Sequence, residues 1–242
     1  MPLKHLLILL FIAIAHGSAF PFTKLVLNDS VPPILMASLR MGLVLAILIP
    51  FWKFKIPEKK YLPSLIAFSI SMGVLVYVFM TLSLYYSSFI GVLIIFFDPK
   101  LANNFLGLFF ASLMALSFGL AQVYSRELRN LDTSLLNAVV GLIGFLVLLI
   151  ISYFIEGEII LNIVSINSNS WMLISYQAIV VSLGAHLLMF YLYKFYTVGK
   201  IFPFYSLFPI FGIILTFLVF GEVPTLLFIL GGIIVITSVF FL

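Results

Sequence analysis

Long apolar stretches alternate along the chain with short polar segments, such as Lys53 to Lys60 and Glu156 to Ser170. A helix rises about 1.5 Å per residue, so about 20 apolar residues cross the ~30 Å hydrocarbon core of a membrane. Runs of about that length or longer predict helical spans over residues 5–24, 33–51, 61–97, 104–125, 133–155, 171–194, 202–220 and 224–242. The first run continues well past Ala13-Ile14-Ala15, so we expect a retained helix and not a cleaved signal peptide.

The run over residues 61–97 has an unusual length. As one helix it would measure about 55 Å, which is too long for a single span and too short for two spans with a turn. An irregular segment is therefore expected within it, near Ser87-Ser88-Phe89.

A weak internal repeat accounts for this length. Four glycine-led segments of the first half match four segments of the second half in the same order, and the offset rises from 111 residues at the third match to 141 at the fourth. The difference corresponds to about one helix plus its turn. The matches are Gly17 to Lys24 with Gly119 to Arg126, Gly42 with Gly141, Gly73 to Tyr85 with Gly184 to Tyr196, and Gly91 with Gly232.

These patterns predict an all-α polytopic membrane protein of two inverted helical repeats, with about eight transmembrane segments. The first repeat, residues 1–101, lacks one helix, whereas the second, residues 102–242, keeps all five. The missing part corresponds to residues 202–231 of the second repeat. Inverted repeats of this kind are a recurrent architecture of transporters.

Charged residues predict the orientation. Cationic residues cluster in three connections, at Lys53 to Lys60, at Arg126 and Arg129, and at Lys194 and Lys200. Loops rich in Lys and Arg remain in the cytoplasm. This rule places both termini in the cytoplasm and requires residues 61–97 to cross the membrane an odd number of times. We expect a single crossing.

Composition supports lipid as the main solvent of this surface. The chain is 64% hydrophobic and 8% charged, whereas a soluble domain carries about 25% charged residues. The net charge of +4 does not indicate a nucleic-acid partner, because the cations lie at the ends of apolar runs. Cysteine is absent, which excludes disulfides and thiolate metal sites. We expect no cofactor and no bound metal.

Several segments resemble the EamA-type drug/metabolite transporter superfamily. They are Ala37-Ser38-Leu39-Arg40, Tyr205 to Glu222 (YSLFPIFGIILTFLVFGE) and the glycine-rich last helix ending at Leu242, and Pro209 to Gly221-Glu222 is the most specific motif. The resemblance covers the chain except for the absent fourth helix. It implies descent from ten helices in two inverted five-helix repeats, with cytoplasmic termini and a substrate cavity that the fourth helix helps to line.

Ionisable residues inside a membrane are costly and are therefore functional candidates. All eight carboxylates fall in loops or at helix ends, and no nucleophile–base pair or nucleotide-binding loop is present. The chain is therefore not expected to be an enzyme or to hydrolyse ATP. Arg40 lies within the second span, where it either anchors a substrate carboxylate or snorkels and packs on backbone carbonyls. His16 and His186 either contact substrate or are satisfied structural histidines.

Other polar or helix-breaking residues within the spans complete the candidate set. Tyrosine hydroxyls there need partners, an amide joins helices or contacts substrate, and a proline interrupts the seventh span. A stripe of small residues from Gly107 to Gly119 is expected to pack against a neighbouring helix. The candidate cavity residues are His16, Arg40, Tyr77, Gln122, Tyr124, His186, Tyr191 and Pro209, and no catalytic residue is predicted.

These features predict a secondary transporter, for efflux or uptake, of small organic metabolites such as amino acids or their derivatives. The competing hypothesis is a degenerate or accessory membrane protein that does not transport, left by an internal deletion. The expected partners are a small-molecule substrate, membrane lipid and a second copy in a homodimer. The expected location is the inner (plasma) membrane of a bacterium. We expect a cavity near His186, walled by the second half and the first and third spans.

Overall fold

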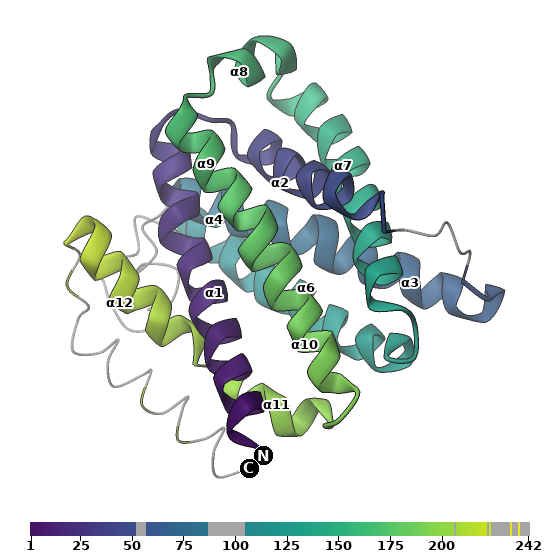
Figure 1. Ribbon diagram of the computed structural model, residues 1–242. Helices are drawn as coiled ribbons and strands as arrows, with labels where there is room; N and C mark the ends of the chain where they lie inside the picture. Colours follow the sequence, from purple (N-terminus) through teal and green to yellow (C-terminus); the bar gives the residue numbers. More distant parts are fainter. Residues whose placement is uncertain are drawn as a thin grey trace.

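The computed structural model describes residues 1–51, 57–86, 105–205 and 207–221, together with Val223, Ile233 and Thr237. All regular elements within these residues are helical (Figure 1). In the first half they are α1 (Leu3–Asn28), α2 (Pro33–Leu48), η1 (Lys59–Tyr61), α3 (Leu62–Ser69), η2 (Ile70–Leu75) and α4 (Val76–Tyr86). In the second half they are α6 (Phe105–Leu128), α7 (Thr133–Ile155), α8 (Ile159–Ser165), α9 (Ser168–Tyr176), η4 (Gln177–Ala185), α10 (His186–Tyr193), α11 (Val198–Tyr205) and α12 (Phe208–Phe220).

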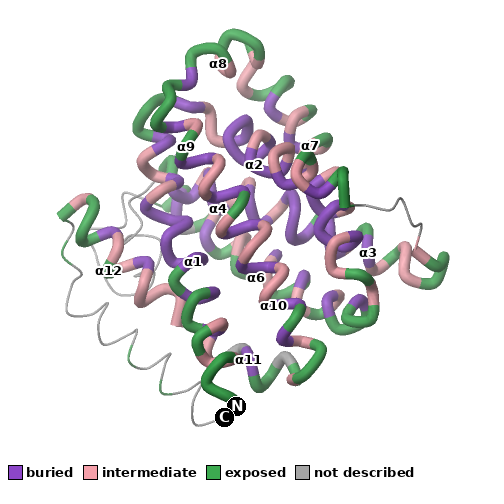
Figure 2. Tube along the Cα trace, viewed as in Figure 1, coloured by how far each residue is buried: buried purple, intermediate pink, exposed green. Residues whose placement is uncertain are grey.

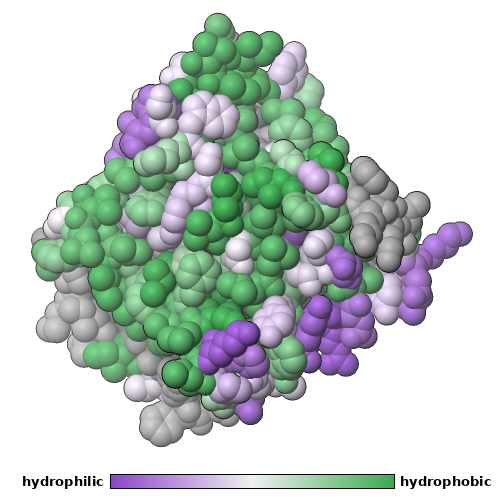
Figure 3. All heavy atoms as spheres, viewed as in Figure 1, coloured by the Kyte–Doolittle hydropathy of each residue, from purple (hydrophilic) through white to green (hydrophobic). Residues whose placement is uncertain are grey.

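Five of the described helical stretches are long and apolar enough to cross a membrane, and two shorter apolar helices accompany them. The long stretches are Leu3–Asn28, Lys59–Tyr86, Phe105–Leu128, Thr133–Ile155 and Ser168–Tyr193, and the shorter helices are Pro33–Leu48 and Phe208–Phe220. Apolar side chains cover most of the face in Figure 3, and hydrophilic ones gather near the ends of the helices. The all-α polytopic membrane fold predicted from the sequence is confirmed.

Two predicted spans differ in detail. Residues Lys59–Tyr86 form one continuous helical stretch with no turn, and its irregularity is a π-helix over Ile70–Leu75. The irregularity expected at Ser87-Ser88-Phe89 lies outside the described residues. The predicted span 202–220 is divided between α11 and α12, and Pro209 occupies the first turn of α12, where a missing N–H costs no helical hydrogen bond. The predicted last span, 224–242, is largely outside the described residues.

π-Helical segments occur at matching places in the two halves. The first contains Gly73 and the second, η4, contains Gly184, which is its counterpart in the sequence repeat. Each segment joins two α-helical parts of one span. π-Helical turns are rare and are frequently found at functional sites. Their paired occurrence supports the predicted repeats, whose boundaries at residue 101 and residue 102 stay a prediction.

Helices α2 and α7, which are also repeat counterparts, pack closely along their lengths (Figure 1). A Cβ atom built at Gly42 of α2 would lie 2.8 Å from the ring of Phe145 in α7. Reciprocally, a Cβ at Gly141 of α7 would lie 3.2 Å from the backbone nitrogen of Leu45 in α2. Equivalent glycines thus let each helix approach the other, as helix packing in membranes requires.

Acidic groups tie the elements together at one end of the bundle. The carboxylate of Asp29 accepts hydrogen bonds from Asn167 Nδ2 (2.9 Å) and Ser170 Oγ (2.5 Å), which hold the pKa of Asp29 below its usual value. Glu156 accepts from two backbone N–H groups in the first turn of α2, at 2.7 and 2.8 Å. A carboxylate is favourable there because the N-terminus of a helix carries partial positive charge.

The opposite end carries the cationic connections. His5 Nδ1 lies 2.7 Å from the hydroxyl of Tyr196, and Ser64 donates to Glu127. Arg126 and Tyr196 line the same hollow, so the connections after α6 and α10 are neighbours. The loops that carry most of the cations therefore share one end of the bundle, away from the end that holds Asp29 and Glu156.

Buried residues concentrate on the inner faces of α1, α2 and η4, whereas α8 and one face of α12 are exposed (Figure 2). The closest approach involves α1 and α12. A Cβ atom built at Gly17 would lie 2.6 Å from the carbonyl oxygen of Phe208 and 2.7 Å from the nitrogen of Gly212. At Gly119, the repeat counterpart of Gly17, a Cβ atom would meet nothing within 4 Å. No described residue thus covers, on α6, the surface that α12 covers on α1.

This asymmetry gives a matched pair of variants. Gly17→Ala should destabilise the protein by about 1–3 kcal/mol, because its methyl group collides with the backbone of α12. Gly119→Ala should leave stability unchanged or raise it slightly, since alanine favours the helix and its methyl group has room. Thermal unfolding of the purified variants in detergent measures both effects. Equal melting temperatures for the two variants would contradict the packing described for Gly17.

Candidate functional site

A cavity of about 1070 Å³ lies among the helices, with walls from both halves of the chain. Its lining residues come from α1, α2, η2 and α4 of the first half and from α6, η4, α10, α11 and α12 of the second half. Its lining is mostly apolar. A few polar groups converge on it, and this combination is typical of a small-molecule site.

Arg40 of α2 is the charged group in this lining and is only 2% exposed. Its Nε donates to Ser182 Oγ (2.7 Å) and its Nη1 donates to Gln177 Oε1 (2.9 Å). The guanidinium carbon lies 4.5 Å from the centre of the Tyr77 ring, in a cation–π contact. The side chain therefore neither snorkels to the membrane surface nor packs on backbone carbonyls.

No carboxylate balances this charge within the described part of the chain. The residues that line the cavity include neither Asp nor Glu, and Arg40 is the only charged residue among the described buried ones. Its Nη2 has no hydrogen-bond partner among the residues that the structure describes. A buried charge is costly unless it is paired, so an anion that enters the cavity would bind favourably here.

The π-helix η4 positions both hydrogen-bond acceptors of Arg40. Gln177 begins the segment and Ser182 lies within it. Gln177 Oε1 accepts a second hydrogen bond from Thr23 Oγ1 (2.8 Å) of α1, and the hydroxyl of Tyr77 lies 3.1 Å from Ser182 Oγ. Four helical segments are thus joined around one guanidinium group.

Two histidines lie beside each other on the same cavity. The rings of His16 and His186 are 5.1 Å apart between centroids. Each Nδ1 is hydrogen-bonded to the carbonyl oxygen four residues earlier, at 2.9 Å for His16 and 2.8 Å for His186. Both Nε2 atoms are buried without a hydrogen-bond partner. Such groups are uncommon in the interior of a protein.

Aromatic and aliphatic side chains complete the walls. The ring of Tyr205 lies 5.1 Å from that of His16, and Phe118 of α6 stacks on Tyr205 at 5.5 Å. On the α6 side, Leu116 and Leu120 line the cavity although they are 66% and 52% exposed. The cavity therefore reaches the outer surface of the described structure along α6.

Comparison with known proteins identifies the family. The model of the EamA-like transporter family matches residues 3–99 and 105–242, nearly the whole chain. The chain belongs to the EamA-like transporter family. A search of curated proteins and a search of solved structures each find no match. The resemblance seen in the sequence is thereby confirmed, and the family is one of membrane transporters of small molecules.

In this EamA-like protein, five of the eight predicted site residues line the cavity. They come from α1, α2, α4, α6 and α10, and they are His16, Arg40, Tyr77, Gln122 and His186. Gln122 also accepts a hydrogen bond from the hydroxyl of Tyr193 (3.1 Å), so its amide joins α6 to α10. The hydrogen bond shows the role of Gln122 in joining helices, and contact with a substrate stays a prediction.

The other three candidates lie away from this cavity. Tyr124 follows Gln122 by two residues, about 200° around the helix, and packs against the cluster that contains Phe68. Tyr191 follows His186 by five residues, about 140° around α10, and is 37% exposed beside His5. Pro209 shapes the start of α12 and is not among the lining residues. Their rotation around the helix, which the apolar pattern does not reveal, explains why Tyr124 and Tyr191 do not line the cavity.

Sequence reasoning missed Gln177, Ser182 and Tyr205. Gln177 carried a usable signal, because it is an amide inside the predicted span 171–194. The small-residue stripe also differs from its prediction. Gly107 and Ala111 are buried, whereas Ala115 and Gly119 are exposed at the open side of the cavity. Only part of the stripe therefore packs against a described helix.

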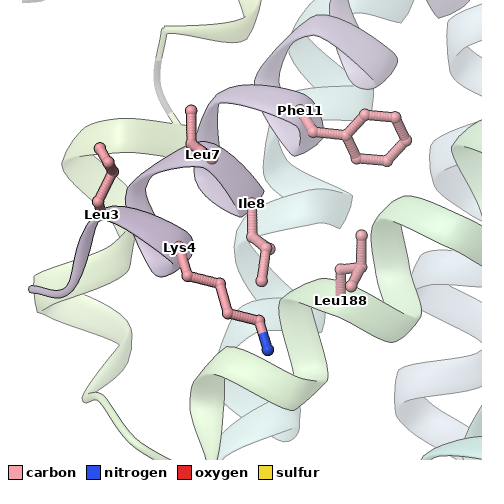
Figure 4. A pocket seen from close by; sticks show the side chains of 6 residues that line it. All are labelled: Leu3, Lys4, Leu7, Ile8, Phe11 and Leu188. Atoms are coloured by element: carbon pink, nitrogen blue, oxygen red, sulfur yellow. The ribbon is translucent and has the colours of Figure 1, made fainter.

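A second hollow is apolar and shallow. Leu3, Leu7, Ile8 and Phe11 of α1 line it with Leu188 of α10, and Lys4 extends toward α10 beside them (Figure 4). One ammonium group above apolar side chains suits the boundary between lipid tails and headgroups. No group of three or more His, Asp or Glu side chains in the described ranges is placed to hold a metal ion.

Proposed function

We propose that this EamA-like protein is a secondary transporter of small organic metabolites that carry a carboxylate, such as amino acids or their derivatives. The observation that carries this proposal is the buried guanidinium of Arg40, which lines the 1070 Å³ cavity without an acidic partner among the described residues. An arginine fork binds a carboxylate through parallel hydrogen bonds. The same cavity has apolar walls that suit the rest of a small metabolite.

The arrangement suits binding and movement of a solute, and we propose no enzymatic reaction for it. Arg40 would hold the solute between α2 and η4, and the π-helical segments of both halves lie next to this point. Alternating access would then expose the cavity to one side of the membrane at a time. Uptake and efflux are both compatible with this geometry.

One observation favours the alternative, a degenerate or accessory protein that does not transport. No described residue covers the face of α6 around Gly119, whereas α12 covers its counterpart on α1, as expected if a helix has been lost. A homodimer, which is one way to close such a gap, stays a prediction. The exposed face of α6, defined by Leu116, Leu120 and Val123, is where its interface would be sought.

We also propose the orientation. Three cationic connections share one end of the bundle, and placing that end in the cytoplasm puts both termini there. The acidic end with Asp29 and Glu156 then faces outward. A bacterial inner membrane is the proposed location of the protein.

Removal of the Arg40 charge tests the function. Arg40→Gln should lower uptake of carboxylate solutes into vesicles by about thirtyfold or more, because the solute loses its charged partner. Thermal stability should change little or rise, since an unpaired buried charge is removed. Lys60→Gln is the matched control, because Lys60 is exposed, lies outside the cavity lining and contacts only its neighbours Glu58 and Tyr61 among described groups.

Two outcomes contradict the proposal. Undiminished carboxylate transport by Arg40→Gln at equal abundance would exclude Arg40 as the anchor. If the wild-type chain moves no solute from a broad panel of metabolites, the non-transporting alternative is supported instead.

The chain has no cysteine, so single introduced cysteines report the orientation directly. Ser165→Cys should react with a membrane-impermeant maleimide added outside intact cells. Thr197→Cys and Lys60→Cys should react only in inverted vesicles. All three positions are exposed, so labelling depends on the side of the membrane. Labelling of Thr197→Cys from outside intact cells would reverse the proposed orientation.

A further inference from the structure

The hydrogen bonds of the two cavity histidines define where their protons lie. A backbone carbonyl oxygen can only accept, so Nδ1 of His16 donates to Ile12 O and Nδ1 of His186 donates to Ser182 O. A neutral imidazole carries one proton, so Nε2 of each ring is then a bare acceptor. The pair thus presents two lone pairs rather than two N–H groups.

Both acceptors belong to rings of the cavity wall. The two rings line the cavity with centroids 5.1 Å apart, and each Nε2 atom is buried and unpartnered. A buried acceptor without a donor is unfavourable, so a donor that arrives with a ligand would be bound well.

Protonation of both rings would not be a favourable way to remove the two unpaired acceptors. Two imidazolium groups beside Arg40 would place three positive charges around a cavity whose lining includes no carboxylate. Mutual repulsion and burial both oppose that arrangement. The donors that satisfy the pair must come from outside the described protein groups.

The histidine pair and the arginine site are adjacent. Ser182 connects them, because its hydroxyl accepts from Arg40 Nε at 2.7 Å while its carbonyl accepts from His186 Nδ1 at 2.8 Å. Ser182 of η4 thus links the cationic donor Arg40 of α2 to the ring of His186, the first residue of α10. A ligand small enough for the cavity can meet both.

We propose that His16 and His186 bind the ammonium group of a zwitterionic solute whose carboxylate is bound by Arg40. This inference rests on the proposed function and narrows its substrate class to amino acids with a free amine and an apolar side chain. An ammonium group has three N–H donors, of which two satisfy the two Nε2 atoms. The apolar side chain lies against the wall formed by Phe118 and Leu120.

The test compares ligands that differ only in the amine. Phenylalanine and leucine are compared with hydrocinnamate and isocaproate, which keep the carboxylate and the apolar body. Binding to the purified full chain is measured by calorimetry and by competition for uptake. The amino acids should bind about tenfold or more tightly than their des-amino analogues, because the analogues leave both acceptors unpaired.

Variants assign this preference to the histidines. His16→Phe and His186→Phe should bring the ratio of the two affinities close to one, while the affinity for hydrocinnamate stays nearly constant. If the histidines had only a structural role, their replacement would instead lower the affinity for both ligands together. His16→Gln and His186→Gln should restore part of the preference, since a side-chain carbonyl can accept the same hydrogen bond. His5→Phe is the control, because His5 lies outside the cavity lining.

The outcomes separate this inference from the proposed function. Equal binding of phenylalanine and hydrocinnamate, with both lost in Arg40→Gln, overturns the histidine assignment and leaves the carboxylate transporter standing. If His16→Phe and His186→Phe both still bind the amino acids more tightly than their des-amino analogues, the histidine assignment is overturned as well. Binding of neither ligand class contradicts the proposed function and this inference together.

Discussion

A single buried positive charge organises the centre of this molecule. The Arg40 guanidinium is removed from water and lipid, and only neutral groups surround it in the described structure: the Gln177 amide, the Ser182 hydroxyl and the Tyr77 ring. Dipoles and a π system offset part of the cost of burial but do not cancel the charge. An arrangement of this kind favours the arrival of an anion, and it sacrifices stability of the empty protein for affinity.

The surrounding helices are shaped to maintain that arrangement. Helix η4 departs from α-helical geometry where it supplies Gln177 and Ser182, and a matching departure in Ile70–Leu75 precedes Tyr77. Close contacts at glycines fix α2 against α7 and α1 against α12. The open face of α6 is the exception. There the membrane, an undescribed part of the chain or a second copy must complete the wall of the cavity.

Hydropathy and charge were sufficient for the class of fold, because lipid imposes a length and a composition on every span. Arg40 and His186 were recognisable for the same reason, since polar groups inside spans are conspicuous. The direction in which individual side chains point, and the packing of the helices, could not be read from the hydropathy pattern. Helical rotation turned Tyr191 away from the cavity, and the π-helical register brought Gln177 toward Arg40. The division of the span 202–220 into α11 and α12 likewise needed the packing of α12 on Gly17.

The central claim is that Arg40, which has no anionic partner among the described residues, obtains one from the solute. An engineered carboxylate at Ser182, whose hydroxyl lies 2.7 Å from Arg40 Nε, tests it most directly. Ser182→Asp should have a higher melting temperature than the neutral, similarly sized Ser182→Asn, because the carboxylate neutralises the guanidinium. It should also no longer be stabilised by added carboxylate solutes. A lower melting temperature for Ser182→Asp than for Ser182→Asn, with solute binding retained, would contradict the account.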